Sequence, residues 1–199
     1  MDLYKKYHVS IGSNIGDRLE NIQSSLDLIH SRIASLTGIS CIYESESIGF
    51  DGDDFYNICA SFFSNISPHL VMQQLLEIEK TLGRSRSAET KYISRIIDID
   101  ILLIEDLVID SEELKVPHPE MCNRRFVMEP LIEIDPNLIH PVSKVSLKEI
   151  HEVFDQNQKI QKKDLVLNNP GNLLSIRNYN YIAIEGNIGS GKTSLSKQI

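Results

Sequence analysis

The sequence predicts an α+β fold in which helices pack on an antiparallel sheet. Stretches with the residue pattern of strands and stretches with helical spacing follow one another in the order β-α-β-β-α-β. This is the order of a ferredoxin-like fold. The length of 199 residues, with 41% hydrophobic and 24% charged residues, is that of an ordinary globular protein.

The first half of this core begins with a short strand at residues 7–11, which enters a turn at 12–14. Asp17 is expected to cap a helix over residues 18–36. The apolar residues of that helix recur at helical spacing: Leu19, Ile22, Leu26, Ile29 and Ile33. A second strand is predicted at residues 39–46.

The second half of the core repeats the pattern. An acidic loop at residues 48–54 precedes a strand at 55–63 and a helix at 68–82. A basic loop at 83–95 then leads into a strongly apolar strand at 96–104. These elements complete the predicted sheet and its two helices.

The rest of the chain is expected to form smaller elements. A hairpin-like stretch at 105–116 is followed by helical pieces at 119–134 and 146–156. We expect this domain to span residues 1–158 and a polar linker, only loosely docked, to follow at 159–178.

Charge and cysteine content exclude several classes of protein. The net charge of −8 disfavours non-specific binding of nucleic acid. The three cysteines form no CxxC motif and no disulfide framework, which favours a reducing, cytoplasmic location. The chain lacks both the apolar segment of a signal peptide near its start and any apolar run of membrane-spanning length, so no membrane partner is expected.

Two carboxylates in the last core strand are the most informative feature of the sequence. Asp98 and Asp100 are two residues apart, so in a strand both side chains lie on one face, about 6.6 Å apart at the backbone. Ile97, Ile99 and Ile101 face the other way, into a core. A carboxylate pair of this kind suits Mg²⁺ together with substrate phosphates. The alternative is a solvated strand face with no ligand.

The loop just before this strand favours the magnesium hypothesis. It carries Arg84, Arg86, Lys91 and Arg95 in an otherwise acidic domain. Guanidinium and ammonium groups match phosphate oxygens. A basic loop that leads into a carboxylate pair predicts a site for a magnesium-bound nucleoside triphosphate.

Four other side chains have both a structural and a functional interpretation. His118, between two prolines, is by itself more typical of a structural histidine than of a catalytic one. The Asn57 amide could bind the edge of a heterocycle or simply lie on a strand face. Phe55 and Phe126 could stack on a flat ring or belong to the core.

Taken together in this order and spacing, residues 7–156 resemble the 6-hydroxymethyl-7,8-dihydropterin pyrophosphokinases of the folate pathway. The matching pieces are Gly12-Ser13-Asn14, Phe55-Tyr56-Asn57, Glu79 with Leu82-Gly83-Arg84, Arg95-x-x-Asp98-x-Asp100, Val116-Pro117-His118-Pro119 and Asn123-Arg124-x-Phe126. The resemblance implies that the chain transfers the terminal pyrophosphoryl group of ATP to the pterin hydroxymethyl group and releases AMP.

The resemblance also implies a role for each matching residue. The residues expected to be catalytic are Arg84, Arg95, Asp98 and Asp100, of which the two aspartates would hold two Mg²⁺ ions. The residues expected to bind ATP are Arg84, Lys91, Arg95, His118 and Arg124. The residues expected to bind the pterin are Ser45, Ile48, Gly49, Phe55, Asn57 and Phe126.

The chain departs from the family pattern in two loops. The aromatic-Gly-Pro-Arg run that is common in the family is Tyr92-Ile93-Ser94-Arg95 here, and a Thr-Pro or similar pair is replaced by Ser45-Glu46. A ferredoxin-like module that has lost catalysis is therefore a rival hypothesis. Loss of activity in Asp98→Ala but not in Lys192→Ala would support the pyrophosphokinase.

Residues 179–199 carry a separate motif. Gly186, Gly191, Lys192 and Thr193 fit the P-loop pattern GxxxxGK[ST], between an apolar strand-like stretch and a helical one. Lys192 would reach phosphates and Thr193 would bind Mg²⁺; the alternative is a glycine-rich turn. The segment is similar to the start of deoxynucleoside kinases, so we expect a bifunctional fusion whose kinase domain continues downstream and is inactive in this stretch alone.

Overall fold

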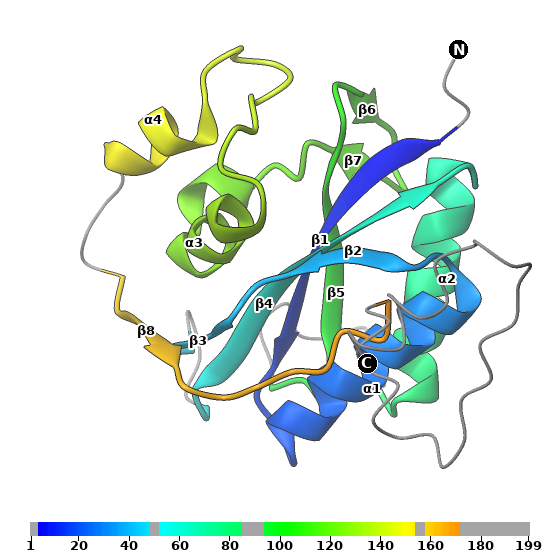
Figure 1. Ribbon diagram of the computed structural model, residues 1–199, viewed down its shortest axis with the longest axis vertical. Coiled ribbons are helices and arrows are strands. Elements are labelled where there is room, and N and C mark those ends of the chain that lie inside the picture. The colour runs from blue at the N-terminus through cyan, green and yellow to red at the C-terminus, as the bar shows by residue number, and fades with distance from the viewer. Residues whose placement is uncertain (1–3, 48–51, 85–93, 154–157, 172–199) are drawn as a thin grey trace, which may run out of the picture.

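The computed structural model of this chain describes residues 4–47, 52–84, 94–153 and 158–171. Within them, six strands form an antiparallel sheet in the order β5-β1-β4-β3-β8, with β2 also paired to β4 (Figure 1). The strands are β1 (Lys5–Ser13), β2 (Leu36–Ile39), β3 (Ile42–Ser45), β4 (Phe55–Ser64), β5 (Asp98–Ile104) and β8 (Ile160–Lys163). The predicted α+β class and antiparallel sheet are confirmed.

Helices lie on both faces of the sheet (Figure 1). Helices α1 (Arg18–Arg32) and α2 (Pro68–Thr81) cover one face. The other face carries the 3₁₀ helix η1 (Met121–Asn123), α3 (Arg125–Ile134) and α4 (Leu147–Glu152). The short strands β6 (Ile109–Asp110) and β7 (Lys115–Val116) form the predicted hairpin.

The alternation of side chains along the strands separates the core from the functional face. Ile97, Ile99 and Ile101 pack with α1 and α2 in the larger hydrophobic core, as predicted. Because neighbouring side chains of a strand point to opposite faces, Asp98 and Asp100 lie on the face that carries α3. The sheet thus has one apolar face and one face that is partly free for ligands.

Two element boundaries differ from the prediction. The Asp17 carboxylate does cap α1, since it accepts a hydrogen bond of 3.1 Å from the backbone N–H of Glu20. The helix ends at Arg32 rather than at residue 36, because β2 begins at Leu36. The strand expected at 39–46 corresponds to β3 at Ile42–Ser45, because Ile39 already ends β2 and the Ser40 hydroxyl between the two strands accepts a hydrogen bond of 3.0 Å from the Cys59 backbone N–H.

The linker predicted from residue 159 is wrong for its first part. Residues 160–163 form β8, which pairs with β3 from Ile160 opposite Ser45 to Lys163 opposite Ile42. Leu165 and Leu167 then pack against the larger core. The polar composition was misleading because the lysines of β8 pair with glutamates of other elements, Lys162 with Glu133 of α3 and Lys163 with Glu44 of β3. Residues 172–199, including the P-loop motif, lie outside the described residues.

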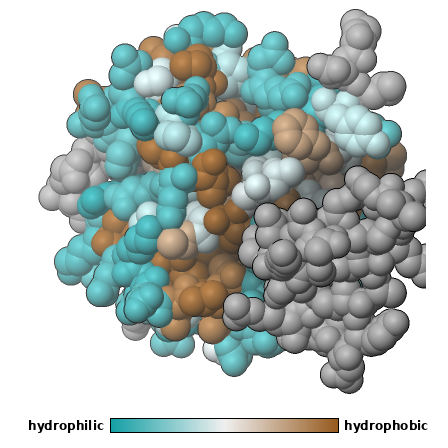
Figure 2. All heavy atoms as spheres, viewed as in Figure 1, coloured by the Kyte–Doolittle hydropathy of each residue, from teal (hydrophilic) through white to brown (hydrophobic). Residues whose placement is uncertain are grey.

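Hydrophilic and hydrophobic residues are distributed unevenly over the surface. In the view of Figure 2, hydrophilic residues cover most of the described periphery, and hydrophobic residues gather nearer the middle. Within the described part of the chain, no helix is both long enough and apolar enough to cross a bilayer.

Candidate active site

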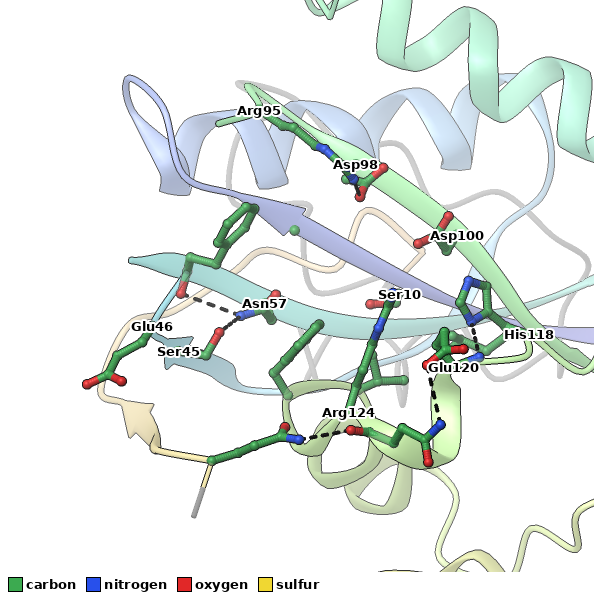
Figure 3. A pocket seen from close by; sticks show the side chains of 17 residues that line it. Ser10, Ser45, Glu46, Asn57, Arg95, Asp98, Asp100, His118, Glu120 and Arg124 are labelled. Atoms are coloured by element: carbon green, nitrogen blue, oxygen red, sulfur yellow. Dashed lines mark hydrogen bonds and ion pairs between the residues drawn. The ribbon is translucent and has the colours of Figure 1, made fainter. Parts of the chain in front are cut away.

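A cavity of about 440 Å³ opens on the sheet face that α1 and α2 leave free (Figure 3). Strands β1, β3, β4 and β5 form its floor, and the segment from His118 to α3 forms a wall. It is lined by Ser10, Gly12, Ser45, Glu46, Phe55, Asn57, Arg95, Asp98, Asp100, Leu102, His118, Glu120, Asn123, Arg124, Phe126, Val127 and Gln158.

The cavity brings together most of the residues that the sequence predicted for a site. Nine of them line it: Ser45, Phe55, Asn57, Arg95, Asp98, Asp100, His118, Arg124 and Phe126. Arg84 lies just behind this lining and reaches Asp98. The predicted site residues Ile48, Gly49 and Lys91, and those of the P-loop motif, lie outside the described residues.

Asp98 is held by two arginines. Its Oδ1 accepts a hydrogen bond of 2.5 Å from Arg84, and its Oδ2 accepts one from Arg95. Burial lowers the pKa of Arg84, but the Asp98 and Glu79 carboxylates outweigh that effect and raise it overall. The Arg84 guanidinium therefore stays charged, and both arginines lie beside Asp98, where phosphate oxygens could bind them.

Glu79, a residue of α2, contacts the Arg84 side chain that binds Asp98. The Glu79 side chain, only 2% exposed, forms an ion pair with Arg84. Its Oε1 also accepts a hydrogen bond of 2.8 Å from the backbone N–H of Ile99. The glutamate therefore joins α2 to β5 between the two aspartates. Its position on the apolar face of α2 was the signal in the sequence for this buried role.

Asp100 differs from Asp98 because its carboxylate forms no hydrogen bond or ion pair with another described residue. Burial and then the neighbouring Asp98 carboxylate raise the pKa of Asp100 above its usual range. His118 lies close to Asp100 (Figure 3). Burial lowers the pKa of His118, although Asp100 acts in the opposite direction. The His118 Nδ1 accepts a hydrogen bond of 3.2 Å from the backbone N–H of Glu120, so Nε2 carries the proton of the neutral ring.

The two carboxylates fit a magnesium ion that shares its ligands with a substrate. Among the described residues, no group of three or more metal-binding side chains could hold an ion unaided. Mg²⁺ is usually held by one or two carboxylates together with phosphate oxygens and water. The open carboxylate of Asp100 next to Asp98 matches that donor set.

The other end of the cavity suits a flat polar ring. Asn57 is buried, and its Nδ2 donates hydrogen bonds to Ser45 Oγ at 3.0 Å and to the Tyr43 carbonyl at 3.4 Å. Gly12 lies opposite it, where a Cβ would approach Asn57 Oδ1 to 3.2 Å, a tight contact that glycine avoids. Phe55 and Phe126 supply aromatic surface on the same cavity.

Asn14 is a site residue whose role the sequence analysis missed. Its Nδ2 donates hydrogen bonds to the Asp53 carbonyl at 3.0 Å and to Ser94 Oγ at 3.1 Å. Its Oδ1 accepts a hydrogen bond of 2.6 Å from the backbone N–H of Arg95. This buried amide therefore joins the described ends of the two loops that border the cavity.

Paired carboxylates with two arginines, beside an amide and aromatic rings, have the chemistry to bind a phosphate compound and a flat heterocycle. Residues 8–136 match the family described as 7,8-dihydro-6-hydroxymethylpterin-pyrophosphokinase (HPPK). The chain therefore belongs to this family.

Curated relatives agree with that assignment. The chain is 37% identical over 143 residues to 2-amino-4-hydroxy-6-hydroxymethyldihydropteridine pyrophosphokinase of Aquifex aeolicus (strain VF5), covering 71% of this chain and 88% of that protein. It is 33% identical over 140 residues to folic acid synthesis protein FOL1 of Dictyostelium discoideum, covering 70% of this chain but only 21% of that protein.

Solved structures show the same fold. The structure of Plasmodium falciparum HPPK-DHPS wild type with SDX-DHP matches with a TM-score of 0.60 at 14% identity, covering 75% of this chain and 44% of that chain. The chain therefore spans most of its bacterial relative but less than half of this larger protein.

Proposed function

We propose that this chain transfers the pyrophosphoryl group of ATP to the hydroxymethyl group of 6-hydroxymethyl-7,8-dihydropterin and releases AMP, a step of folate biosynthesis. One observation carries the proposal. In a chain of this family, Asp98 and Asp100 lie together with charged arginines at one end of a cavity whose other end presents Asn57 and aromatic rings.

The phosphate end would be assembled on β5. We assign Asp98 and Asp100 as the ligands of two Mg²⁺ ions, which when bound would neutralise the phosphate charge. Arg84 and Arg95 would exchange their contacts with Asp98 for contacts with the transferring phosphates. His118 and Arg124, on the facing wall, would bind the rest of ATP.

The pterin end would be assembled on β3 and β4. The Asn57 amide already donates to Ser45 and the Tyr43 carbonyl, which fixes its orientation toward the edge of the ring. Phe55 and Phe126 would hold the faces of the ring. We also assign Ile48 and Gly49 to this end and Lys91 to the phosphate end, as the family resemblance implies.

The reaction is then a matter of positioning and charge. The hydroxymethyl oxygen attacks the β-phosphorus of ATP while the bond from that phosphorus to the bridging oxygen of AMP breaks. Phosphoryl transfer depends mainly on alignment and on stabilising the phosphate charge. Asn57 would align the acceptor, whereas Arg84 and Arg95 would stabilise the charge on the transferring group.

A product assay with Asp100→Asn tests this function. The protein is incubated with Mg-ATP and 6-hydroxymethyl-7,8-dihydropterin, and AMP is resolved from ADP. We expect pterin-dependent AMP, and a loss on the order of 10²–10³-fold in kcat for Asp100→Asn. Because the Asp100 carboxylate forms no hydrogen bond to a described residue, this isosteric change should leave folding intact. Asp110→Asn, an exposed carboxylate on β6, is the matched control.

Two outcomes would contradict the proposal. Absence of pterin-dependent AMP would remove the activity and favour a module without catalysis. Full activity of Asp100→Asn would remove the metal assignment while leaving the reaction intact.

A second proposal concerns residues 179–199. The P-loop pattern from Gly186 to Thr193 supports binding of a nucleotide phosphate, and its likeness to deoxynucleoside kinases supports a fused kinase domain. In the same assay with deoxynucleosides in place of the pterin, we expect no ADP, because residues 179–199 hold only the first elements of such a kinase; formation of ADP would contradict that expectation.

We also place the protein in the cytoplasm, which its three cysteines without a disulfide framework support.

A further inference from the structure

Gln158 lines the same cavity although it lies well beyond residues 8–136, which the family match covers. It lies two residues before the edge strand β8 and faces the junction between η1 and α3. This segment was expected to border a linker, so its presence in the cavity wall calls for a physical explanation.

The Gln158 side chain binds the backbone on both sides of Arg124. Its Nε2 donates a hydrogen bond of 2.9 Å to the carbonyl of Asn123, and its Oε1 accepts one of 2.9 Å from the backbone N–H of Arg125. The Arg125 guanidinium in turn donates to the Gln158 carbonyl at 3.2 Å.

These contacts replace a cap that α3 lacks. Arg124 is the N-cap residue of α3, and no side-chain hydrogen bond is made from that position. The first backbone N–H groups of a helix have no partner inside the helix and need one from elsewhere. Gln158 supplies that partner from 33 positions further along the chain.

The residues that follow Gln158 also contact the opposite end of the cavity. Strand β8 pairs with β3, placing Ile160 opposite Ser45, which lines the cavity. Lys159, next to Gln158, forms a 2.9 Å ion pair with Glu46, another lining residue. Strand β8 thus connects the wall that carries Arg124 to the strand that carries Ser45.

We propose that Gln158 is a positioning residue that acts through Arg124, and that the catalytic domain extends through β8. By fixing the backbone before and after Arg124, Gln158 holds that guanidinium at the cavity, 6.0 Å from the Phe126 ring. This inference rests on the proposed role of Arg124 in ATP binding.

A double-mutant cycle on the full chain tests the inference. We expect Gln158→Ala to raise the KM for Mg-ATP about three- to tenfold, with kcat and the KM for the pterin changed less than about twofold. In an Arg124→Ala background, the same substitution should have no further effect on that KM. Gln161→Ala, an exposed glutamine on β8, is the matched control, and melting temperatures are measured for all variants.

The outcomes separate three situations. An unchanged KM in Gln158→Ala, or an effect that persists in the Arg124→Ala background, would overturn the inference and leave the proposed reaction intact. An Arg124→Ala protein with normal kinetics would overturn the role of Arg124 and the inference with it. Absence of pterin-dependent AMP in the unaltered protein would instead overturn the proposed function.

Discussion

Replacing Glu79 by alanine tests whether this buried carboxylate stabilises the part of the protein that holds Arg84 and Asp98. The substitution removes a buried carboxylate that binds both the Arg84 guanidinium and the Ile99 backbone N–H. Removing one partner of a buried ion pair costs about 3–5 kcal/mol, because the other charge loses its compensation. An unsatisfied buried N–H costs about 1–3 kcal/mol. Arg84 keeps Asp98, which limits the first loss.

We therefore expect Glu79→Ala to lower the free energy of unfolding by about 3–5 kcal/mol, which corresponds to a fall in melting temperature on the order of 10 °C. Glu79→Gln should lose less, because its amide oxygen can still accept from Ile99. Urea unfolding at pH 7 measures both variants against Glu77→Ala, an exposed glutamate on the same helix.

A loss below about 1 kcal/mol in Glu79→Ala would refute this reasoning, because no buried pair of this kind is neutral when one partner alone is removed. An equal loss in Glu77→Ala would also refute it, since Glu77 binds neither Arg84 nor Ile99 through its side chain in the described structure.

Three other buried groups give separate predictions. Burial and Lys6 lower the pKa of His8 to about 4, so the unfolded chain binds more protons than the folded chain between pH 6.5 and 4. The free energy of unfolding should therefore decrease as the pH is lowered from 6.5 to 4, and it should decrease less in His8→Gln. Thiol labelling followed by mass spectrometry should modify Cys59, which is fully buried, only after unfolding. Asn14→Ala should lose about 1–3 kcal/mol in urea unfolding, since three hydrogen bonds disappear.

Local patterns predicted most of the fold. The spacing of apolar residues located both core helices, and Asp17 marked the start of α1 correctly. The elements that were missed depend on distant partners. Strand β8 is polar, and its lysines are matched only by Glu44 and Glu133, which are far away in the sequence. No pattern within residues 160–163 carries that information.

In the site, too, local patterns predicted some residues, whereas others depend on distant partners. Strand alternation alone put Asp98 and Asp100 on one face, and the structure confirms that both line the cavity. The supporting residues could not be assigned, because each acts on backbone far along the chain: Asn14 on Arg95, and Gln158 on Arg125. Only Glu79, a charge on an apolar helix face, left a local signal.

The register of β5 determines whether this chemistry is available. A shift of one residue would turn Asp98 and Asp100 into the core and Ile99 into the cavity. Among the described strands, β5 pairs only with β1 and so lies at the edge of the sheet. An edge strand has backbone groups that point away from its partner. The carboxylate of Glu79 takes one of them, the Ile99 N–H, and binds Arg84 at the same time. One buried side chain therefore fixes both the register that presents the two aspartates and the arginine that faces them.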